Sequence, residues 1–200
     1  MNPLIDDLLK KSPAEYAGYI NSLKDIFQDM QNDYQAAADA YPFCCKGCED
    51  SCCRTRFYHH TLLEYVYLLA GYRHLDRDTR GDVQIRAQQA CEELQATDVQ
   101  DVREKRMCPV NFNGLCGLYD YRPMICRLHG IPHELHRPGR DISYGPGCDE
   151  FTRLCSQAGY HKFDRTPHYF AMANLENKFK KELGYTGKTK MTIAEMIVTF

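Results

Sequence analysis

The chain lacks a strong charge of either sign, tryptophan, and any long hydrophobic run. Across 200 residues, 25 Lys and Arg face 27 Asp and Glu, which gives a formal net charge of -2. This balance offers no broad basic surface, so we expect neither nucleic acid nor an anionic membrane as a partner. The longest apolar stretch, Val66 to Ala70, is far too short to cross a bilayer.

Several sequence signatures of enzymes and of exported proteins are also missing. The chain contains no phosphate-binding glycine loop, no nucleophile elbow and no HExxH helix motif. Two acids, Asp6 and Asp7, stand where a secretory signal would carry basic residues. We therefore expect a cytoplasmic protein, in which glutathione and thioredoxin keep thiols reduced.

Cysteine is the residue that the chain has in excess. Of eleven cysteines, five lie within ten residues (Cys44, Cys45, Cys48, Cys52 and Cys53), and a second set follows at Cys108, Cys116, Cys126 and Cys148. An odd count excludes complete disulfide pairing within the chain. Thiolates suit zinc, copper(I) and iron-sulfur sites, so in a reducing compartment this density favours metal binding over a disulfide framework. Buried, reduced thiols that only pack are the alternative.

Helical patterns flank the cysteine segments. Ser12-Pro13-Ala14-Glu15 and Thr61-Leu62-Leu63-Glu64 have the form of capping boxes, and each precedes apolar residues at helical spacing. The first helix should end before Tyr41-Pro42, and Gly71 is a plausible end for the second. Further helices are predicted after Asp78, from Thr97 toward Met107, from Thr166-Pro167, and from Thr192 to Phe200. Their apolar faces comprise Val83, Ala87, Ala90, Cys91 and Leu94 in the first of these, and Phe170, Ala173, Leu175, Phe179 and Leu183 in the helix after Thr166.

Residues 108 to 148 differ from these helical segments. Eleven glycines and prolines interrupt any long periodicity, which predicts loops with at most short helical turns. Such a segment needs more than a hydrophobic core to order it, and a bound metal would do so. We predict a mainly α fold, a single helical domain over residues 1–200, wrapped around an irregular, metal-ordered cysteine-rich region at 44–148.

Five short motifs carry a family resemblance. Cys45-x2-Cys48 and Cys52-Cys53 are followed by Cys108-Pro109, Gly114-Leu115-Cys116-Gly117 and Arg122-Pro123-Met124-Ile125-Cys126-Arg127. In this order they resemble the zinc- or iron-chelating family named for its CxxCxxCC motif, the YkgJ-like cysteine-cluster proteins. The resemblance implies the following metal-associated cysteines: Cys45, Cys48, Cys52, Cys53, Cys108, Cys116 and Cys126, with Cys148 as a further member.

One departure from the family motif leaves the first group of ligands open. Three residues separate Cys48 from Cys52, where the family has two, so Cys44 is an alternative to Cys45. The spacing does not choose between zinc and iron, or an iron-sulfur cluster, and it matches neither a zinc ribbon nor the usual radical-SAM motif.

The functional reading is a metal-binding cysteine-cluster protein. An iron-sulfur oxidoreductase or protein-modifying enzyme is one alternative, since members that resemble this family occur in proteins that modify flagellin lysines. A metal carrier that passes its ion to a protein partner is another.

His129 is the best histidine candidate for a further ligand, whereas His133 and His136 are expected at the surface of a loop. Cys91 is expected to pack in a helix, and Cys155 is left open.

Overall fold

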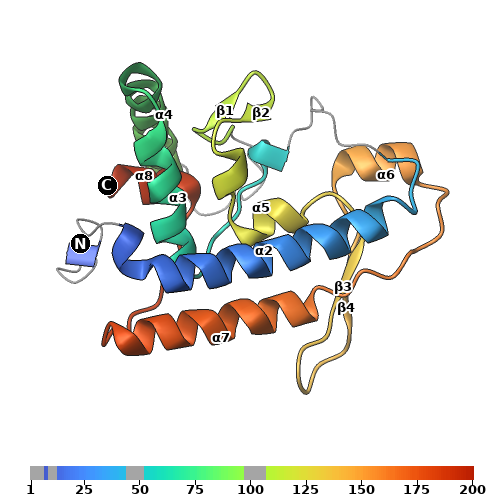
Figure 1. The fold of residues 1–200 in the computed structure, drawn as a ribbon. Coiled ribbons are helices and arrows are strands. Elements are labelled where there is room, and N and C mark those ends of the chain that lie inside the picture. The colour runs from blue at the N-terminus through green and yellow to red at the C-terminus, as the bar shows by residue number, and fades with distance from the viewer. Residues whose placement is uncertain (1–6, 9–12, 44–51, 97–106) are drawn as a thin grey trace.

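The computed structural model describes residues 7–8, 13–43, 52–96 and 107–200, and helices dominate it (Figure 1). The α-helices are α2 (Ala17–Ala38), α3 (Leu62–His74), α4 (Arg77–Ala96), α5 (Met124–Leu128), α6 (Asp149–Cys155), α7 (Thr166–Glu182) and α8 (Ile193–Val198). Short 3-10 turns are η1 (Pro13–Tyr16), η2 (Cys52–Arg54) and η3 (Tyr119–Tyr121). The strands are β1 (Asn111–Phe112), β2 (Leu115–Cys116), β3 (His133–Leu135) and β4 (Ser143–Gly145). The mainly α prediction is confirmed, whereas the ordering of residues 44–148 by a metal stays a prediction.

The buried side chains form one cluster between the longer helices. Helices α2 and α7 lie side by side along one face, and α8 packs against α4 on another (Figure 1). Helix α2 contributes Leu23, Phe27 and Met30, all of which are buried. The predicted first helix is therefore confirmed, with its first turn in the 3-10 form, while its capping residue Ser12 lies outside the described residues.

Helix α3 is buried along most of its length and begins as the sequence predicts. The Thr61 hydroxyl accepts a hydrogen bond from the Glu64 backbone N–H at 3.2 Å, which satisfies one open donor at the helix start. The prediction that Gly71 ends this helix is wrong, because α3 continues to His74. Gly71 has another role: a Cβ there would overlap the ring of Tyr121, so its absence lets η3 lie against α3.

Two buried carboxylates join three helices. Glu176 of α7 accepts hydrogen bonds from the first backbone N–H groups of α3, at Leu62 (2.8 Å) and Leu63 (3.1 Å). Glu64 of α3 in turn accepts one from the Met124 N–H at the start of α5, at 2.6 Å. Carboxylates are favourable at helix N-termini because the open N–H groups there carry partial positive charge.

The buried face of α7 agrees with the predicted one only in part. Phe179 is buried, and Leu175 and Leu183 pack against the core, as predicted. Phe170, however, is 52% exposed and Ala173 is also exposed, whereas His168, Met172 and Glu176 are buried. The apolar pattern was misleading because a charged residue, Glu176, occupies the inner face and bonds to α3.

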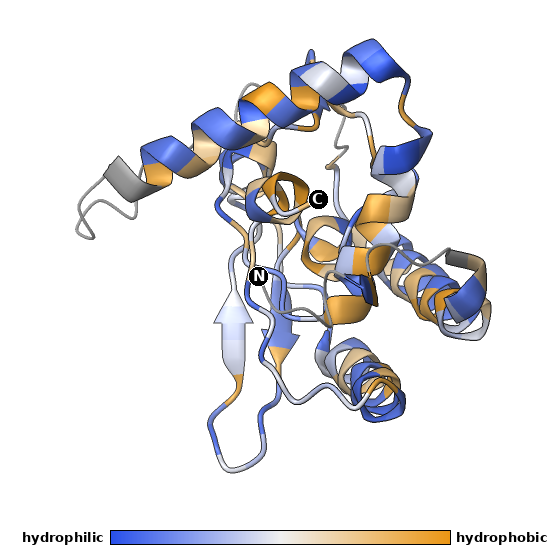
Figure 2. Ribbon diagram, turned by 90° about the vertical axis from the view of Figure 1, so that its left-hand side faces the viewer, coloured by the Kyte–Doolittle hydropathy of each residue, from blue (hydrophilic) through white to orange (hydrophobic). Residues whose placement is uncertain are grey.

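Helices α4 and α8 agree with the sequence patterns. Val83 and Ala87 of α4 are fully buried, while most of the helix is hydrophilic (Figure 2). Helix α8 begins with a complete capping box, in which Thr192 and Glu195 each bond to the other's backbone N–H. The helix predicted from Thr97 lies outside the described residues. Within the described residues, no helix has the length and apolar character needed to span a membrane.

Residues 108–148 hold more regular structure than predicted. They contain the antiparallel pairs β1–β2 and β3–β4, as well as η3 and α5. The loop prediction for this segment is therefore wrong in part, because elements of two to five residues are too short to produce a periodic pattern.

Candidate metal centre

Four of the predicted cysteines surround one cavity. Cys53 lies in η2, Cys108 precedes β1, Cys116 ends β2, and Cys126 lies in α5. All four line a cavity of about 400 Å³. Segments that lie up to 73 positions apart in the sequence therefore bring their thiols to one place.

The β1–β2 hairpin brings Cys108 and Cys116 together. Its two-residue loop is Asn113-Gly114, and both residues have positive φ values, 52° and 86°. Asn-Gly favours this kind of tight turn, whose twist matches that of the flanking strands. The dipeptide is visible in the sequence, and it could have predicted the hairpin.

Backbone contacts attach the other two cysteines. The Cys108 N–H donates to the Cys53 carbonyl at 2.8 Å, which ties η2 to the segment that leads into β1. Cys126 lies in the first turn of α5, after Pro123, and the first N–H of that helix is bonded to Glu64. The Glu64 carboxylate of the buried helix α3 thus holds the start of α5 in position.

The cavity wall combines thiols, apolar groups and cations. Phe43 and Cys53, the described side chains on either side of residues 44–52, both line it. Other lining residues include Phe57, His59, Leu94, Met107, Leu115, Tyr119, Arg122, Arg127, His129 and Ile193. This lining can hold both a metal centre and a small apolar or anionic molecule.

The thiols are strongly perturbed by burial. Burial raises the pKa of Cys108 from 9.0 to about 12, raises that of Cys126 well above its ordinary value, and also raises that of Cys116. The negative charges of the neighbouring cysteines add to each shift. Without a cation among them, these thiols stay protonated at neutral pH, whereas a coordinating metal ion deprotonates a thiol outright.

Two arginines supply positive charge beside the thiols. Arg122 and Arg127 both lower the pKa of Cys116 and so oppose part of the burial effect. Arg127 is held by a bond from its Nε to the Arg122 carbonyl at 2.7 Å, and its guanidinium lies 4.1 Å from the centroid of the Phe27 ring. These contacts give the two arginines of the Arg122-to-Arg127 motif a structural role.

The thiols do not already have the spacing of a zinc site. A tetrahedral zinc site with Zn–S bonds of about 2.3 Å places its sulfurs roughly 3.8 Å apart. Among the described cysteines, no three sulfurs lie within 4.8 Å of one another, so binding of a single zinc ion would require these side chains to move.

Two histidines also border the cavity. His129 was the predicted candidate, and burial with the nearby Arg165 lowers its pKa to about 4. His59 is 3% exposed, and burial likewise lowers its pKa to about 4. Both rings are therefore neutral at physiological pH, the form in which imidazole binds metals.

Other predicted residues lie apart from this cavity. Cys148 is the N-cap of α6, where its sulfur accepts a hydrogen bond from the Phe151 N–H at 3.3 Å, and it is not among the lining residues. Cys91 packs against the core on α4, as predicted, and Cys155 is buried in α6, a helix that the sequence analysis missed.

The other predicted cysteines lie wholly or partly outside the described residues. Cys44, Cys45 and Cys48 lie outside the described residues, and only the backbone of Cys52 is described, in η2. The choice between Cys44 and Cys45 therefore stays open.

Comparisons with models of known protein families, with curated proteins and with solved structures find no match to this chain. The resemblance to the cysteine-cluster proteins rests on the motifs alone and stays a prediction.

Proposed function

We propose that Cys53, Cys108, Cys116 and Cys126 form a thiolate metal centre. The observation that carries the proposal is their convergence: four cysteines from four separate segments of the chain line one cavity. Thiols that served only as apolar filler would have no reason to gather at one place. The donor set suits zinc or iron.

An iron-sulfur cluster is one form that this centre could take. Such clusters are held by four cysteine thiolates, the number of described cysteines that line the cavity. When bound, the group would supply electron transfer. The protein's own residues would exclude water from it, and Arg122 and Arg127 would balance its negative charge.

Anaerobic purification, followed by metal analysis and a visible spectrum, tests this proposal. We expect a brown protein that contains iron and acid-labile sulfide. Colourless protein with stoichiometric zinc would replace the cluster with a zinc centre. Protein without either metal, after purification from cells supplied with both, would overturn the proposal.

Matched cysteine variants locate the centre. Cys108→Ser, Cys116→Ser and Cys126→Ser should each lose most of the bound metal. Cys91→Ser is the control, because Cys91 lies on α4 and does not line the cavity. Equal metal content in all four variants would contradict the assignment.

An enzyme that uses the centre in chemistry is a second candidate. The cavity beside the thiols has about 400 Å³ of space, which lies within the usual range for small-molecule sites. Its apolar wall and its arginines would suit a substrate with an apolar body and an anionic end. Turnover of any such compound, lost in Cys126→Ser, would distinguish the enzyme from a protein that only holds metal.

Family and location form part of the same proposal. The motifs around these cysteines resemble those of the YkgJ-like cysteine-cluster proteins, so membership of that family is part of the proposal, and a reducing cytoplasm would keep the ligands available. A metal carrier that delivers its ion to a protein partner is the remaining alternative. A carrier should lose its metal rapidly to a competing chelator. A buried centre should instead retain the metal.

A further inference from the structure

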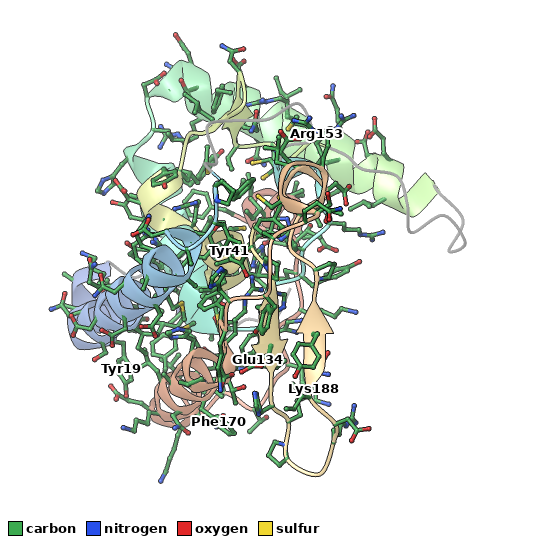
Figure 3. All side chains as sticks on the ribbon, turned by 90° about the vertical axis from the view of Figure 1, so that its right-hand side faces the viewer. Tyr19, Tyr41, Glu134, Arg153, Phe170 and Lys188 are labelled. Atoms are coloured by element: carbon green, nitrogen blue, oxygen red, sulfur yellow. The ribbon has the colours of Figure 1, made fainter. Side chains whose placement is uncertain are left out.

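A second group of side chains that could hold a metal contains no cysteine. It lies on and after β3 and beside the start of α7. Glu134 is on β3 (Figure 3). It pairs with Tyr144 of β4 and also forms a bridge with Asp164. The Glu134 N–H donates to the Phe163 carbonyl at 2.9 Å, and the Arg165 N–H donates to the Glu134 carbonyl at 3.0 Å. These bonds hold the backbones of Glu134 and Asp164 next to each other.

The third member of the group is His136, which is also fixed through its backbone. Its N–H donates to the Thr166 hydroxyl at 2.7 Å. The Thr166 N–H donates to Oδ1 of Asp164 at 2.8 Å, so Oδ2 is the oxygen that lies near the histidine ring. Three possible ligands are therefore positioned before any ion is bound.

The three donor atoms lie within 4.8 Å of one another. Nε2 of His136 is 3.2 Å from Oε1 of Glu134 and 3.8 Å from Oδ2 of Asp164. Ligands at bonds of about 2.0–2.2 Å around one divalent ion lie roughly 3–3.5 Å apart, so only small side-chain shifts separate this arrangement from a coordinating one.

Burial adds to the case for a cation here. Glu134 is 5% exposed, and its Oε1 lies 3.2 Å from both Nε2 of His136 and Nζ of Lys162. A buried carboxylate needs a countercharge. Lys162 supplies one, but its side chain is 71% exposed, so an incoming ion can replace it.

We propose that Glu134, His136 and Asp164 form a second metal site, which binds a divalent cation such as Mn²⁺, Fe²⁺ or Zn²⁺. Two carboxylates and one imidazole are a harder donor set than thiolates, so this site and the cysteine centre prefer different metals. The Lys162 ammonium acts as the countercharge in the metal-free chain, and it moves into solvent when the ion binds.

Mn²⁺ is the probe for this site because thiolates bind it poorly. Titration of the full chain at pH 7.5, with free Mn²⁺ followed by electron paramagnetic resonance, should show one bound ion. Glu134→Gln and Asp164→Asn should weaken its binding at least tenfold. Asp141→Asn removes an exposed carboxylate from the loop between β3 and β4 and should leave binding unchanged.

Lys162→Met separates a metal site from a structural ion pair. In a metal site, removal of the competing ammonium strengthens Mn²⁺ binding several-fold, and Mn²⁺ then raises the melting temperature of the variant. If Lys162→Met lowers the melting temperature and gains no affinity for Mn²⁺, the group is an ion-pair network and the proposal is wrong. Binding that Glu134→Gln and Asp164→Asn leave unchanged would also overturn it.

Cys126→Ser keeps this test independent of the thiolate centre. That variant should bind Mn²⁺ as the unmodified chain does. Loss of Mn²⁺ binding in a Cys126→Ser chain that keeps its helicity would place the ion at the cysteines and contradict the assignment.

Discussion

The helical part of the molecule and the cysteine region are stabilised in different ways. In the first, Leu23, Phe27, Met30 and Phe179 are buried in a common core, and hydrophobic burial accounts for their order. In the second, two-residue strands and a five-residue helix surround a cavity, and the thiols inside are held protonated by burial. The first region is complete as a folded structure, whereas the second has the donors for a further component.

The largest effect should come from the helical part alone. Phe179 is 1% exposed and its ring packs edge-on against Tyr16 with centroids 5.4 Å apart. Phe179→Ala should lower the free energy of unfolding by about 3–5 kcal/mol, because it leaves a cavity in the core. Urea unfolding measures this, and Phe170→Ala, at an exposed site on the same helix, is the control. An equal loss in both variants would contradict the assignment of the α7 face.

The next effect tests the junction between the two regions. Gly71→Ala places a methyl group against the Tyr121 ring and should cost roughly 1–3 kcal/mol through overpacking. Since Tyr121 lies between Cys116 and Cys126 in the chain, metal content should fall as well. Gly18→Ala, where a Cβ has open space on helix α2, should lower neither quantity, because alanine favours a helix more than glycine does. Normal metal content in Gly71→Ala would show that the two regions are independent.

Alkaline pH should weaken the cysteine region selectively. Below pH 9 the Cys108 thiol is protonated in both the folded and the unfolded chain; above it, the unfolded chain ionises first, because burial holds the folded pKa at about 12. The metal-free chain should therefore lose about 1.4 kcal/mol of stability from this group by pH 10. Urea unfolding at pH 8 and pH 10 measures the loss. Other groups, such as tyrosines, also titrate in this range, and the same measurement on Cys108→Ser gives their contribution. A metal-loaded chain should not show this loss, since its thiols are already ionised.

The smallest effect concerns the hairpin turn. Asn113 has a φ of 52°, so Asn113→Ala should cost about 1 kcal/mol, whereas Asn113→Gly should be close to neutral. The turn sets the position of Cys116 relative to Cys108. Metal affinity, measured by competition with a chelator, should therefore fall in the alanine variant and not in the glycine variant. Equal affinities would show that the turn does not position these ligands.

The sequence predicted the parts of the fold that local chemistry determines. The N-caps at Thr61 and Thr192 and the buried stripe of α4 follow from spacing and residue type, and the structure has them where they were expected. The inner face of α7 could not be predicted in this way. It depends on Glu176, whose burial makes sense only once the open N–H groups of α3 are next to it.

The cysteines of the candidate site could be selected from the sequence, whereas the residues around them could not. The motifs singled out Cys53, Cys108, Cys116 and Cys126, yet no spacing rule indicated that His59 would border the same cavity. It does so because an isolated bridge to Met191 brings it there. The Glu134 group was missed for a similar reason, since a pairing between residues 134 and 164 leaves no local signal.

The two buried carboxylates have a consequence for the order in which the protein matures. Glu176 anchors the start of α3, and Glu64 on α3 anchors the start of α5, which carries Cys126. Every cysteine of the proposed centre is synthesised before α7, whereas the start of α3, which anchors the helix of Cys126, is bonded to α7. We therefore expect stable metal insertion to follow the synthesis of α7 rather than to accompany that of the cysteines.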